Sequence, residues 1–256
     1  MNEITIKVLK GFPEINKNAL LADLISKNLK KNNIVLKSGD VLCIAHKIVS
    51  KAEGRIVHLP DIEPSSKAIY YANILNKDPR KVEVILSESR KVVRHFKHER
   101  QNEGTMICEH KLGFISANAG VDESNVAGRD NVLLLPKNPD VSAKKIMNYF
   151  KKKYNTDIGL VITDTFGRPW RVGQVNVAIG VSGIPVTKSE KGTEDSFGNF
   201  MKVTEPAFCD EIAAASGLVI KKSSKTPIVL FRGLEWVKAK SSIKDVLRNK
   251  KEDMFL

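Results

Sequence analysis

The stretch GLVITDTFGRPWRVGQVNVAIGVSG, residues 159–183, decides how this sequence folds. An apolar run on each side of its centre predicts two buried strands. The polar segment between them carries an acid, Asp164, a hydroxyl, Thr165, and two arginines, Arg168 and Arg171, together with turn-forming glycine and proline. We interpret 162–171 as a tight turn that presents these side chains at the edge of a sheet.

The remaining elements are predicted from apolar periodicity on either side of this stretch. Alternating or continuous apolar runs predict strands at 4–11, 40–50, 131–136, 157–164, 175–183 and 227–233, and a hairpin around 111–113. Helical spacing predicts helices at 18–31, 64–76, 79–93, 141–154, 206–220 and 241–254, with a break of the third near Ser87 as an alternative. Strands and helices are mixed without a regular βαβ rhythm. The sequence therefore favours an α+β (mixed α/β) fold of mixed sheets packed with helices over a doubly wound sheet.

Length and composition predict a globular chain with a sizeable core. The 256 residues, 42% of them hydrophobic, are enough for one large domain or two small ones. We treat 1–256 as a single unit, with two intimately associated subdomains as the alternative, because no boundary is readable. No apolar run is long enough for a membrane helix, and the N-terminus resembles a strand rather than a signal peptide. Cys43, Cys108 and Cys209 lie in apolar contexts and predict reduced core thiols in a cytoplasmic protein.

The chain is strongly basic, with a formal net charge of +13. This charge fits anionic partners such as nucleotides, phosphorylated small molecules or nucleic acid, although a solvated lysine-rich surface explains it equally well. The densest basic run, 90–100, contains one aromatic residue, Phe96, and so offers no stacking platform for bases. Nucleic-acid binding is therefore a weaker hypothesis than a site for a small anion.

Three polar turns follow predicted buried strands and could form one site. They lie at 46–55, 118–125 and 163–171, and they carry Lys47, Lys51, Glu53, Asp122, Glu123, Asn125, Asp164, Thr165, Arg168 and Arg171. Carboxylates and hydroxyls suit hard cations such as Mg(II) or Mn(II), while lysines and arginines neutralise phosphate. The sequence has no phosphate-binding GxxxxGK[ST] or GxGxxG motif, and it has no CxxC motif.

Each of these side chains also has an ordinary structural interpretation. Asp122 could form an Asx-turn, Asp164 could cap the segment after its strand, and the arginines could pair with surface acids. Lys51 could simply be solvated. Spacing alone therefore predicts only a phosphate site of unspecified chemistry.

Several longer segments resemble a known family. They are GFPEI, IVSKAEGRIV, ILSESRKVVR, GFISANAGVDESNV, GLVITDTFGRPWRVGQVNVAIGVSGI, CDEIAAA and PIVLFRG, collinear over roughly residues 10–235. The chain is similar in these segments to the coenzyme F-420-0:γ-glutamyl ligases. The resemblance implies an α+β fold found as an intertwined homodimer. It implies a GTP-dependent enzyme that joins L-glutamate to the carboxylate of a phospholactyl deazaflavin coenzyme, through an acyl phosphate.

The resemblance also implies roles for individual residues. Asp122 and Asp164 match ligands of a first divalent cation, and Thr165 matches a ligand of a second. Nucleotide contacts are implied for Phe12, Pro13, Glu14, Ile15, His46, Lys47, Lys51 and Asn125. Arg168 and Arg171 would lie near the phosphates as catalytic residues. No general base is implied; Glu53 and Glu123 are only close in sequence to matched residues.

One segment departs from the family pattern. A glycine-rich nucleotide-binding segment with a metal-binding acid or glutamine is replaced by IKKSSKTP, 220–227, in which Lys222 occupies the ligand position. An ammonium group cannot bind a metal. Either Lys222 replaces the second cation and contacts phosphate, or the chain is a paralogue that uses another nucleotide or carboxylate. A non-catalytic protein that binds nucleic acid or a deazaflavin is the alternative outside enzymes.

Overall fold

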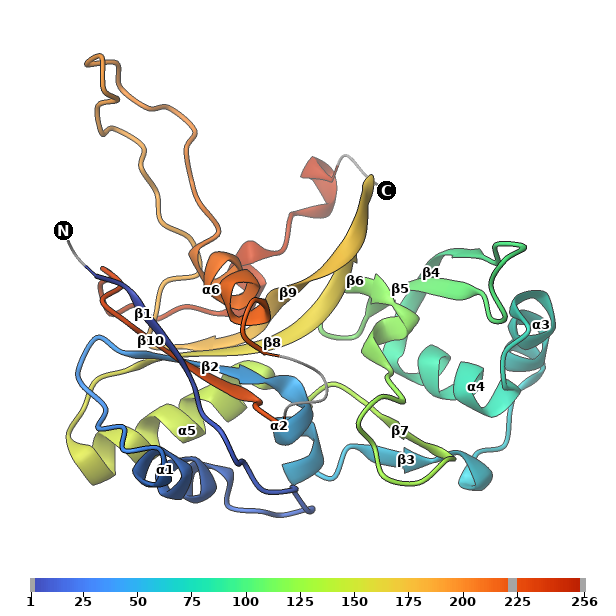
Figure 1. The fold of residues 1–256 in the computed structure, drawn as a ribbon. Helices are drawn as coiled ribbons and strands as arrows, with labels where there is room; N and C mark the ends of the chain where they lie inside the picture. Colours follow the sequence, from blue (N-terminus) through green and yellow to red (C-terminus); the bar gives the residue numbers. More distant parts are fainter. Residues whose placement is uncertain (1–2, 221–224, 254–256) are drawn as a thin grey trace.

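A five-stranded mixed sheet forms the centre of the computed structural model, which describes residues 3–220 and 225–253 (Figure 1). Its strand order is β1-β10-β2-β8-β9. The strands are β1 (Thr5–Val8), β10 (Ile228–Arg232), β2 (Val41–Ala45), β8 (Gly159–Arg168) and β9 (Arg171–Ser182). β2 and β8 run parallel, and the other neighbours are antiparallel. The mixed sheet and its helices confirm the predicted α+β class.

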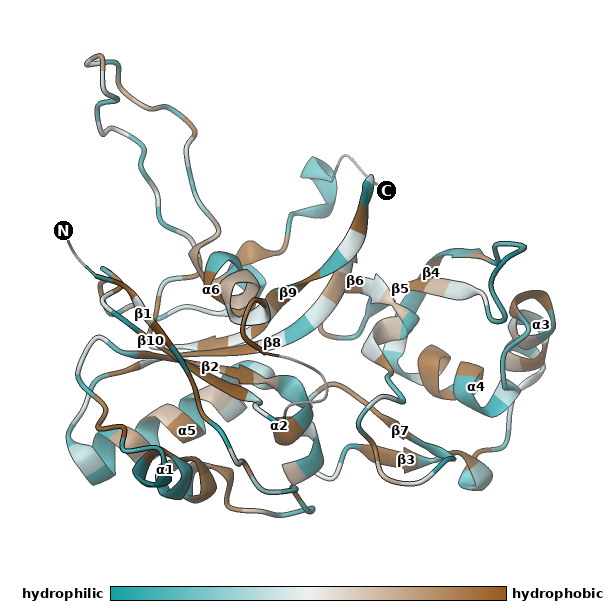
Figure 2. Cartoon of the chain, in the orientation of Figure 1, coloured by the Kyte–Doolittle hydropathy of each residue, from teal (hydrophilic) through white to brown (hydrophobic). Residues whose placement is uncertain are grey.

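Helices cover both faces of this sheet. α1 (Leu21–Lys31) and α5 (Pro139–Tyr154) lie on one face, and α6 (Phe208–Gly217) lies on the other (Figure 1). Burial on both faces explains why β2 reads as a continuous apolar run rather than an alternating one. Hydrophobic residues are concentrated along the central strands (Figure 2). α5 approaches β9 so closely that a Cβ on Gly180 would lie 2.3 Å from Cβ of Pro139.

Residues 56–134 form a second lobe beside the sheet, and most of its buried apolar side chains form a separate cluster. Its helices are α3 (Ser66–Leu75) and α4 (Pro79–Glu88). Its strands are β3 (Ile56–His58), β4 (Ser89–Phe96), β5 (Thr105–His110), β6 (Ile115–Ala117) and β7 (Asn131–Leu133). β3 pairs with β7, while β4, β5 and β6 form a three-stranded sheet. The predicted hairpin around 111–113 is the turn between β5 and β6.

Helix starts follow ordinary capping chemistry. The side chain of Asp78 accepts a hydrogen bond from the backbone of Arg80 at the start of α4. Asn138 caps α5 in the same way, and each helix has a proline in its first turn. Proline is tolerated there because its missing N–H would have no partner within the helix. α5 accordingly begins before the predicted residue 141.

Three predicted elements are wrong in type or extent. The predicted strand 40–50 ends at Ala45, and α2 (His46–Ala52) follows it directly. The predicted helix 79–93 ends at Glu88, and its remainder belongs to β4. In place of a charged helix at 241–254, the described residues form two short 3-10 turns, Ile243–Val246 and Lys250–Glu252.

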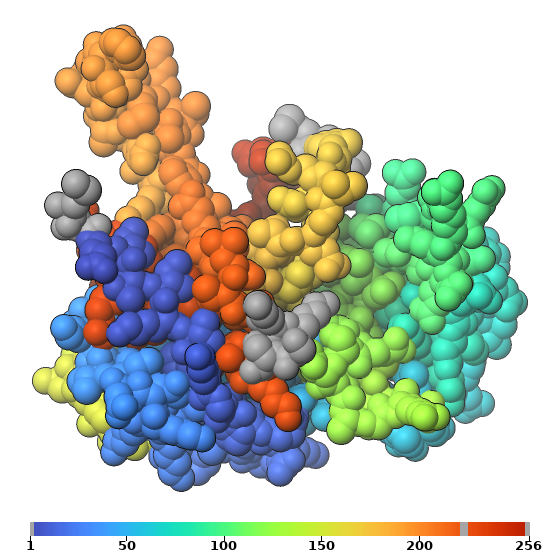
Figure 3. Space-filling view, in the orientation of Figure 1, coloured from blue at the N-terminus to red at the C-terminus, as the bar shows by residue number. Residues whose placement is uncertain are grey.

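The predicted compact turn at 162–171 is instead a long hairpin. β8 continues to Arg168 and β9 begins at Arg171, so Pro169 and Trp170 alone form the turn. The hairpin extends away from the body of the molecule (Figure 1). A second projection, the loop 187–206, stands out beyond α6 (Figure 3). Its two arms are joined by backbone hydrogen bonds, including Gly192 N to Met201 O at 2.9 Å.

Two further expectations concern the cysteines and the membrane. Cys43, Cys108 and Cys209 are buried and free, as predicted. Among the residues that the structure describes, no helix is both long enough and apolar enough to cross a membrane.

Candidate active site

The parallel pairing of β2 with β8 brings two of the predicted polar turns together. The register sets Ala45 beside Thr163. His46 and Lys47 therefore leave β2 next to the point where Asp164 continues β8. The carboxyl ends of adjacent parallel strands are the usual place for such a group of side chains.

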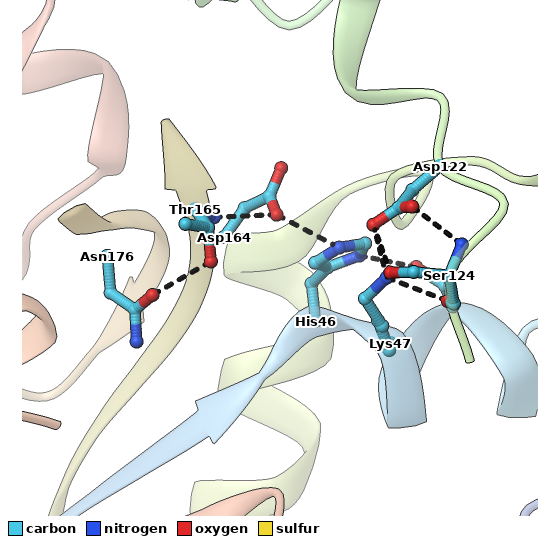
Figure 4. A network of polar contacts seen from close by, with 8 residues as sticks. His46, Lys47, Asp122, Ser124, Asp164, Thr165 and Asn176 are labelled. Atoms are coloured by element: carbon cyan, nitrogen blue, oxygen red, sulfur yellow. Dashed lines mark hydrogen bonds and ion pairs between the residues drawn. The ribbon is translucent and has the colours of Figure 1, made fainter. Parts of the chain in front are cut away.

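The third predicted turn reaches the same place from the second lobe. Asp122 exchanges two backbone hydrogen bonds with Leu133, which fixes the start of the turn. Asp122 Oδ1 accepts a hydrogen bond of 2.7 Å from Ser124 N, so the Asx-turn is present. The same carboxylate also faces Lys47 (Figure 4). Asp122 thus shapes its own turn and contacts the other lobe.

Basic residues of α2 neutralise the carboxylates around this site. Lys47 forms an ion pair with Asp122, and Lys51 forms one with Glu14. Burial alone would raise the pKa of Asp122, but the hydrogen bond and charge of Lys47 outweigh it and hold that pKa below its usual value. The hydrogen bond from Lys51 likewise lowers the pKa of Glu14. Both carboxylates are therefore held in their charged form.

His46 and Asp164 form the third contact between α2 and an acid. The Nε2 atom of His46 lies 3.2 Å from Oδ1 of Asp164. The atoms are close but poorly aligned, so this buried nitrogen has no hydrogen-bond partner among the residues that the structure describes. Asp164 Oδ1 accepts instead from Thr165 N at 2.7 Å. The second Asp164 oxygen points away from these contacts (Figure 4).

A cavity of about 380 Å³ opens over these side chains. The predicted residues that line it are Phe12, Pro13, Glu14, Ile15, His46, Lys47, Lys51, Asn125, Asp164 and Thr165. Asp122 is not among the lining residues and lies behind Lys47, to which it is paired. Apolar and charged walls in one cavity can hold a ligand that has both a flat ring and phosphate groups.

Asn176 belongs to this site but was missed in the sequence. It faces Thr165 across the hairpin, and Thr165 Oγ1 donates a hydrogen bond of 2.8 Å to its Oδ1. Its Nδ2 donates in turn to Ser216 Oγ on α6, at 3.2 Å. The available signal was a lone amide inside the apolar run VNVAIGV, since a polar residue in a buried strand needs a partner.

The structure does not bring Arg168 and Arg171 into this cavity. They occupy the exposed end of the hairpin, where Arg168 Nη2 donates to Val172 O at 3.3 Å. Arg168 lies four residues beyond Asp164 along β8, which corresponds to ~13 Å in an extended strand. Their expected role beside the phosphates stays a prediction, since the strands carry both arginines well past the cavity of their own chain.

The segment that departs from the family pattern is described only in part. Lys222 lies outside the described residues. Ile220, Lys225, Thr226 and Pro227, on either side of the gap, line the cavity. The altered segment therefore borders the site, and Lys225 adds another cation to its wall.

The donor chemistry of the site fits a hard divalent cation. Asp164 supplies a carboxylate and Thr165 a hydroxyl at the cavity, and Asp122 supplies a second carboxylate beside it. Within 3–220 and 225–253, no group of three or more His, Cys, Asp or Glu side chains is arranged to hold a metal ion. A site with only two carboxylates suits Mg(II) or Mn(II), which retain water and bind phosphate oxygens as further ligands.

The two glutamates that are close in sequence to the site are engaged elsewhere. Glu53 accepts hydrogen bonds from Lys137 N, at 2.9 Å, and from Ser142 Oγ, at 2.5 Å. Glu123 pairs with Lys81 of α4, at 2.8 Å. Neither glutamate lines the cavity. Their contacts are those of side chains that hold loops in place.

Comparisons with known proteins identify the family to which the chain belongs. The sequence model described as F420-0:Gamma-glutamyl ligase matches residues 11–233. A Methanopyrus kandleri protein named coenzyme F420:L-glutamate ligase is 41% identical over 240 residues, covering 92% of this chain and 90% of the relative. The proteins of that name from Methanocaldococcus jannaschii and Methanothermobacter thermautotrophicus are each 37% identical. Each alignment covers 98% of this chain, with 94% of the first relative and 98% of the second. On this evidence, the chain belongs to the F420-0:γ-glutamyl ligase family.

Proposed function

We propose that this protein is a ligase that joins L-glutamate through an amide bond to the carboxylate of a phospholactyl deazaflavin coenzyme, with GTP as phosphoryl donor. Family membership supports glutamate ligation to this coenzyme. The family resemblance also supports the dependence on GTP and the route through an acyl phosphate.

The observation that carries the proposal is the composition of the cavity at the ends of β2 and β8. Oxygen ligands on Asp164 and Thr165 lie in the same wall as the ammonium groups of Lys47 and Lys51. Phosphoryl transfer needs such a combination, because the reacting group carries charge on several oxygens while the protein mainly positions the reactants.

In the first step, the coenzyme carboxylate attacks the terminal phosphorus of the nucleotide, and the diphosphate leaves. Lys51 and Lys225 line the wall where they can neutralise phosphate charge, and the apolar Phe12 and Ile15 can pack against the base. A divalent cation held by Asp122, Asp164 and Thr165 would supply charge neutralisation between phosphate groups. The buried Nε2 of His46 is available as a hydrogen-bond partner for the same ligand.

In the second step, the amine of L-glutamate attacks the acyl carbon, and inorganic phosphate leaves. The amine must lose a proton to form the amide. Glu53 and Glu123 are unsuited to accept it, since both are bound outside the cavity. The proposed function of the cavity is therefore to align the amine with the acyl phosphate.

A ligation assay tests the proposal directly. Purified protein is mixed with L-glutamate, the unglutamylated deazaflavin and Mn(II) or Mg(II), with GTP or ATP in parallel. We expect glutamylated product with stoichiometric GDP and phosphate. Product formed with ATP but not with GTP would show that the enzyme prefers ATP, and we would attribute this preference to the altered 220–227 segment. If nucleotide binds in a metal-dependent way but no product forms, the deazaflavin is not the acceptor. The protein would then be a paralogue that acts on another carboxylate.

The basic run 90–100 does not favour a second function. It forms β4 and the turn after it in the second lobe, and none of its residues lines the cavity. The hypothesis of a nucleic-acid-binding protein stays a prediction, with salt-dependent affinity as its test.

A further inference from the structure

The ammonium group of Lys47 has a complete set of partners in this structure. It forms an ion pair with Asp122 and donates to Ser124 O at 2.9 Å and to Ser124 Oγ at 2.8 Å. An ammonium has three N–H donors, and each of them is used here. Lys47 is at the start of α2, whereas both of its partners belong to the second lobe. The contact therefore links α2 to the turn of the second lobe that carries Asp122 (Figure 4).

The carboxylate of Asp122 is also heavily engaged, with three of its roughly four lone-pair sites in use. One oxygen accepts from Ser124 N at 2.7 Å, and the other accepts from Lys47 and from Ser124 Oγ, at 2.9 Å. Asp164, by contrast, has one oxygen turned away from its contacts with His46 and Thr165 (Figure 4). A cation could thus reach Asp164 directly, whereas at Asp122 it would meet the ammonium group of Lys47, whose charge competes for the same carboxylate.

We propose that Lys47 is an exchangeable counter-cation: it neutralises Asp122 until a divalent cation takes its place, and it then pairs with the phosphate of the nucleotide in the same cavity. This inference rests on the proposed function, because it requires a divalent cation at Asp122. Lys47 is already a lining residue, so its four-carbon chain needs only to rotate away from Ser124 to face a ligand.

The exchange couples the two ligands thermodynamically. Without nucleotide, the cation must break the ion pair and leave the ammonium group with only the two Ser124 acceptors, so metal binding is weakened. With nucleotide, a phosphate oxygen replaces the lost carboxylate, so metal binding is stronger. Linkage is reciprocal, so the metal strengthens nucleotide binding by the same factor. With both ligands bound, neither charge would be left unpaired, because the cation neutralises Asp122 and the phosphate pairs with Lys47.

Lys51 provides a matched control. It lies one helical turn after Lys47 on α2, lines the same cavity and also pairs with a carboxylate. Its partner, however, is Glu14, which is not among the proposed metal ligands. Replacing either lysine removes one positive charge from the cavity, but only the Lys47 change frees Asp122.

The test is binding of Mn(II), measured by electron paramagnetic resonance of the free ion, with and without GDP. Lys47→Met is expected to bind Mn(II) alone about tenfold more tightly than the original protein, since the competing charge is gone. Lys51→Met should show a clearly smaller gain, and Lys47→Arg, which keeps the charge, should bind as the original protein does. The gain in Mn(II) affinity on adding GDP should shrink in Lys47→Met.

Circular dichroism confirms that each variant is folded before the titrations are compared. Equal Mn(II) affinity in Lys47→Met and the original protein, or equal gains in both lysine variants, would overturn the exchange while leaving the metal site intact. Absence of Mn(II) binding to the original protein even with GDP would instead overturn the metal part of the proposed function, and the exchange with it.

Discussion

At the scale of single residues, Asp164 gives the most direct test of the metal site. Replacing it with asparagine keeps the size and the acceptor for Thr165 N but removes the charge. We expect Asp164→Asn to weaken Mn(II) binding in the presence of GDP by about tenfold or more, because hard cations prefer carboxylate oxygens. Asp61→Asn, at an exposed acid of the second lobe, is the control and should bind Mn(II) normally. Unchanged affinity in Asp164→Asn would remove Asp164 from the ligand set.

Asp210 of α6 allows a prediction of how the stability of the protein depends on pH. Burial raises the pKa of Asp210, although the hydrogen bond from Ala178 N opposes this effect. An acid whose pKa is raised on folding stabilises the fold below its unfolded pKa, about 4, and loses that contribution as pH rises through its folded pKa. Asp210→Asn retains an acceptor for Ala178 N without the buried charge. We therefore expect the variant to be at least as stable as the original protein at pH 7.

Urea unfolding at pH 4 and pH 7 checks this expectation. From pH 4 to pH 7, the free energy of unfolding of the original protein should fall relative to that of Asp210→Asn. Glu211→Gln, at the exposed neighbouring position, is the control and should show the same pH dependence as the original protein. A variant that is less stable than the original protein at pH 7 would show that the charge of Asp210 is needed in the fold.

At the scale of elements, Lys81 connects α4 to the turn that carries Asp122. Its buried side chain pairs with Glu123, at 2.8 Å, and with Glu103, at 3.1 Å. Glu123 is adjacent to Asp122, so the ion pair between Lys81 and Glu123 helps to fix the position of Asp122, the proposed metal ligand, within the second lobe. Lys81→Met should lower the free energy of unfolding by roughly 1–2 kcal/mol, less than for a fully buried pair because both glutamates are about half exposed.

The same variant should also loosen the Asp122 turn. We expect Lys81→Met to weaken Mn(II) binding several-fold, whereas Lys67→Met on α3, at an exposed position, should alter neither property. Urea unfolding and Mn(II) titration measure the two effects separately. A loss of stability without any loss of affinity would mean that the turn is held by its Leu133 and Ser124 contacts alone.

The success of sequence reasoning differed between elements for physical reasons. Helical periodicity located α1, α4 and α5, because an amphipathic face is visible in a single segment. The change from β2 to α2 at His46 was missed, since a continuous apolar run suits a buried strand and a buried helix equally well. The length of the β8–β9 hairpin was missed too, because Gly167 permits a turn without requiring one. The grouping of the three polar turns was predictable, since each follows a strand.

At the scale of the whole molecule, two projections expose apolar side chains that the rest of the chain leaves uncovered. Trp170 and Val172 lie at the end of the β8–β9 hairpin, and Phe197, Phe200 and Val203 lie on the loop 187–206; all are largely exposed. Apolar side chains gathered on projecting arms are characteristic of surfaces that another chain covers. We propose that these arms form part of the interface of the homodimer that the family resemblance implies.

The dimer is testable by sedimentation equilibrium. Because Phe197 and Val203 make few contacts within their own chain, Phe197→Ser with Val203→Asp should leave the monomer folded but shift the assembly from dimer towards monomer, by at least tenfold in dissociation constant. Val35→Asp with Leu20→Ser, at exposed apolar positions near α1, is the matched control and should not affect association. If the original protein sediments as a monomer at micromolar concentration, the arms must have another partner. If the loop variant stays a dimer, the interface lies elsewhere on the molecule, and the β8–β9 hairpin becomes the next surface to change.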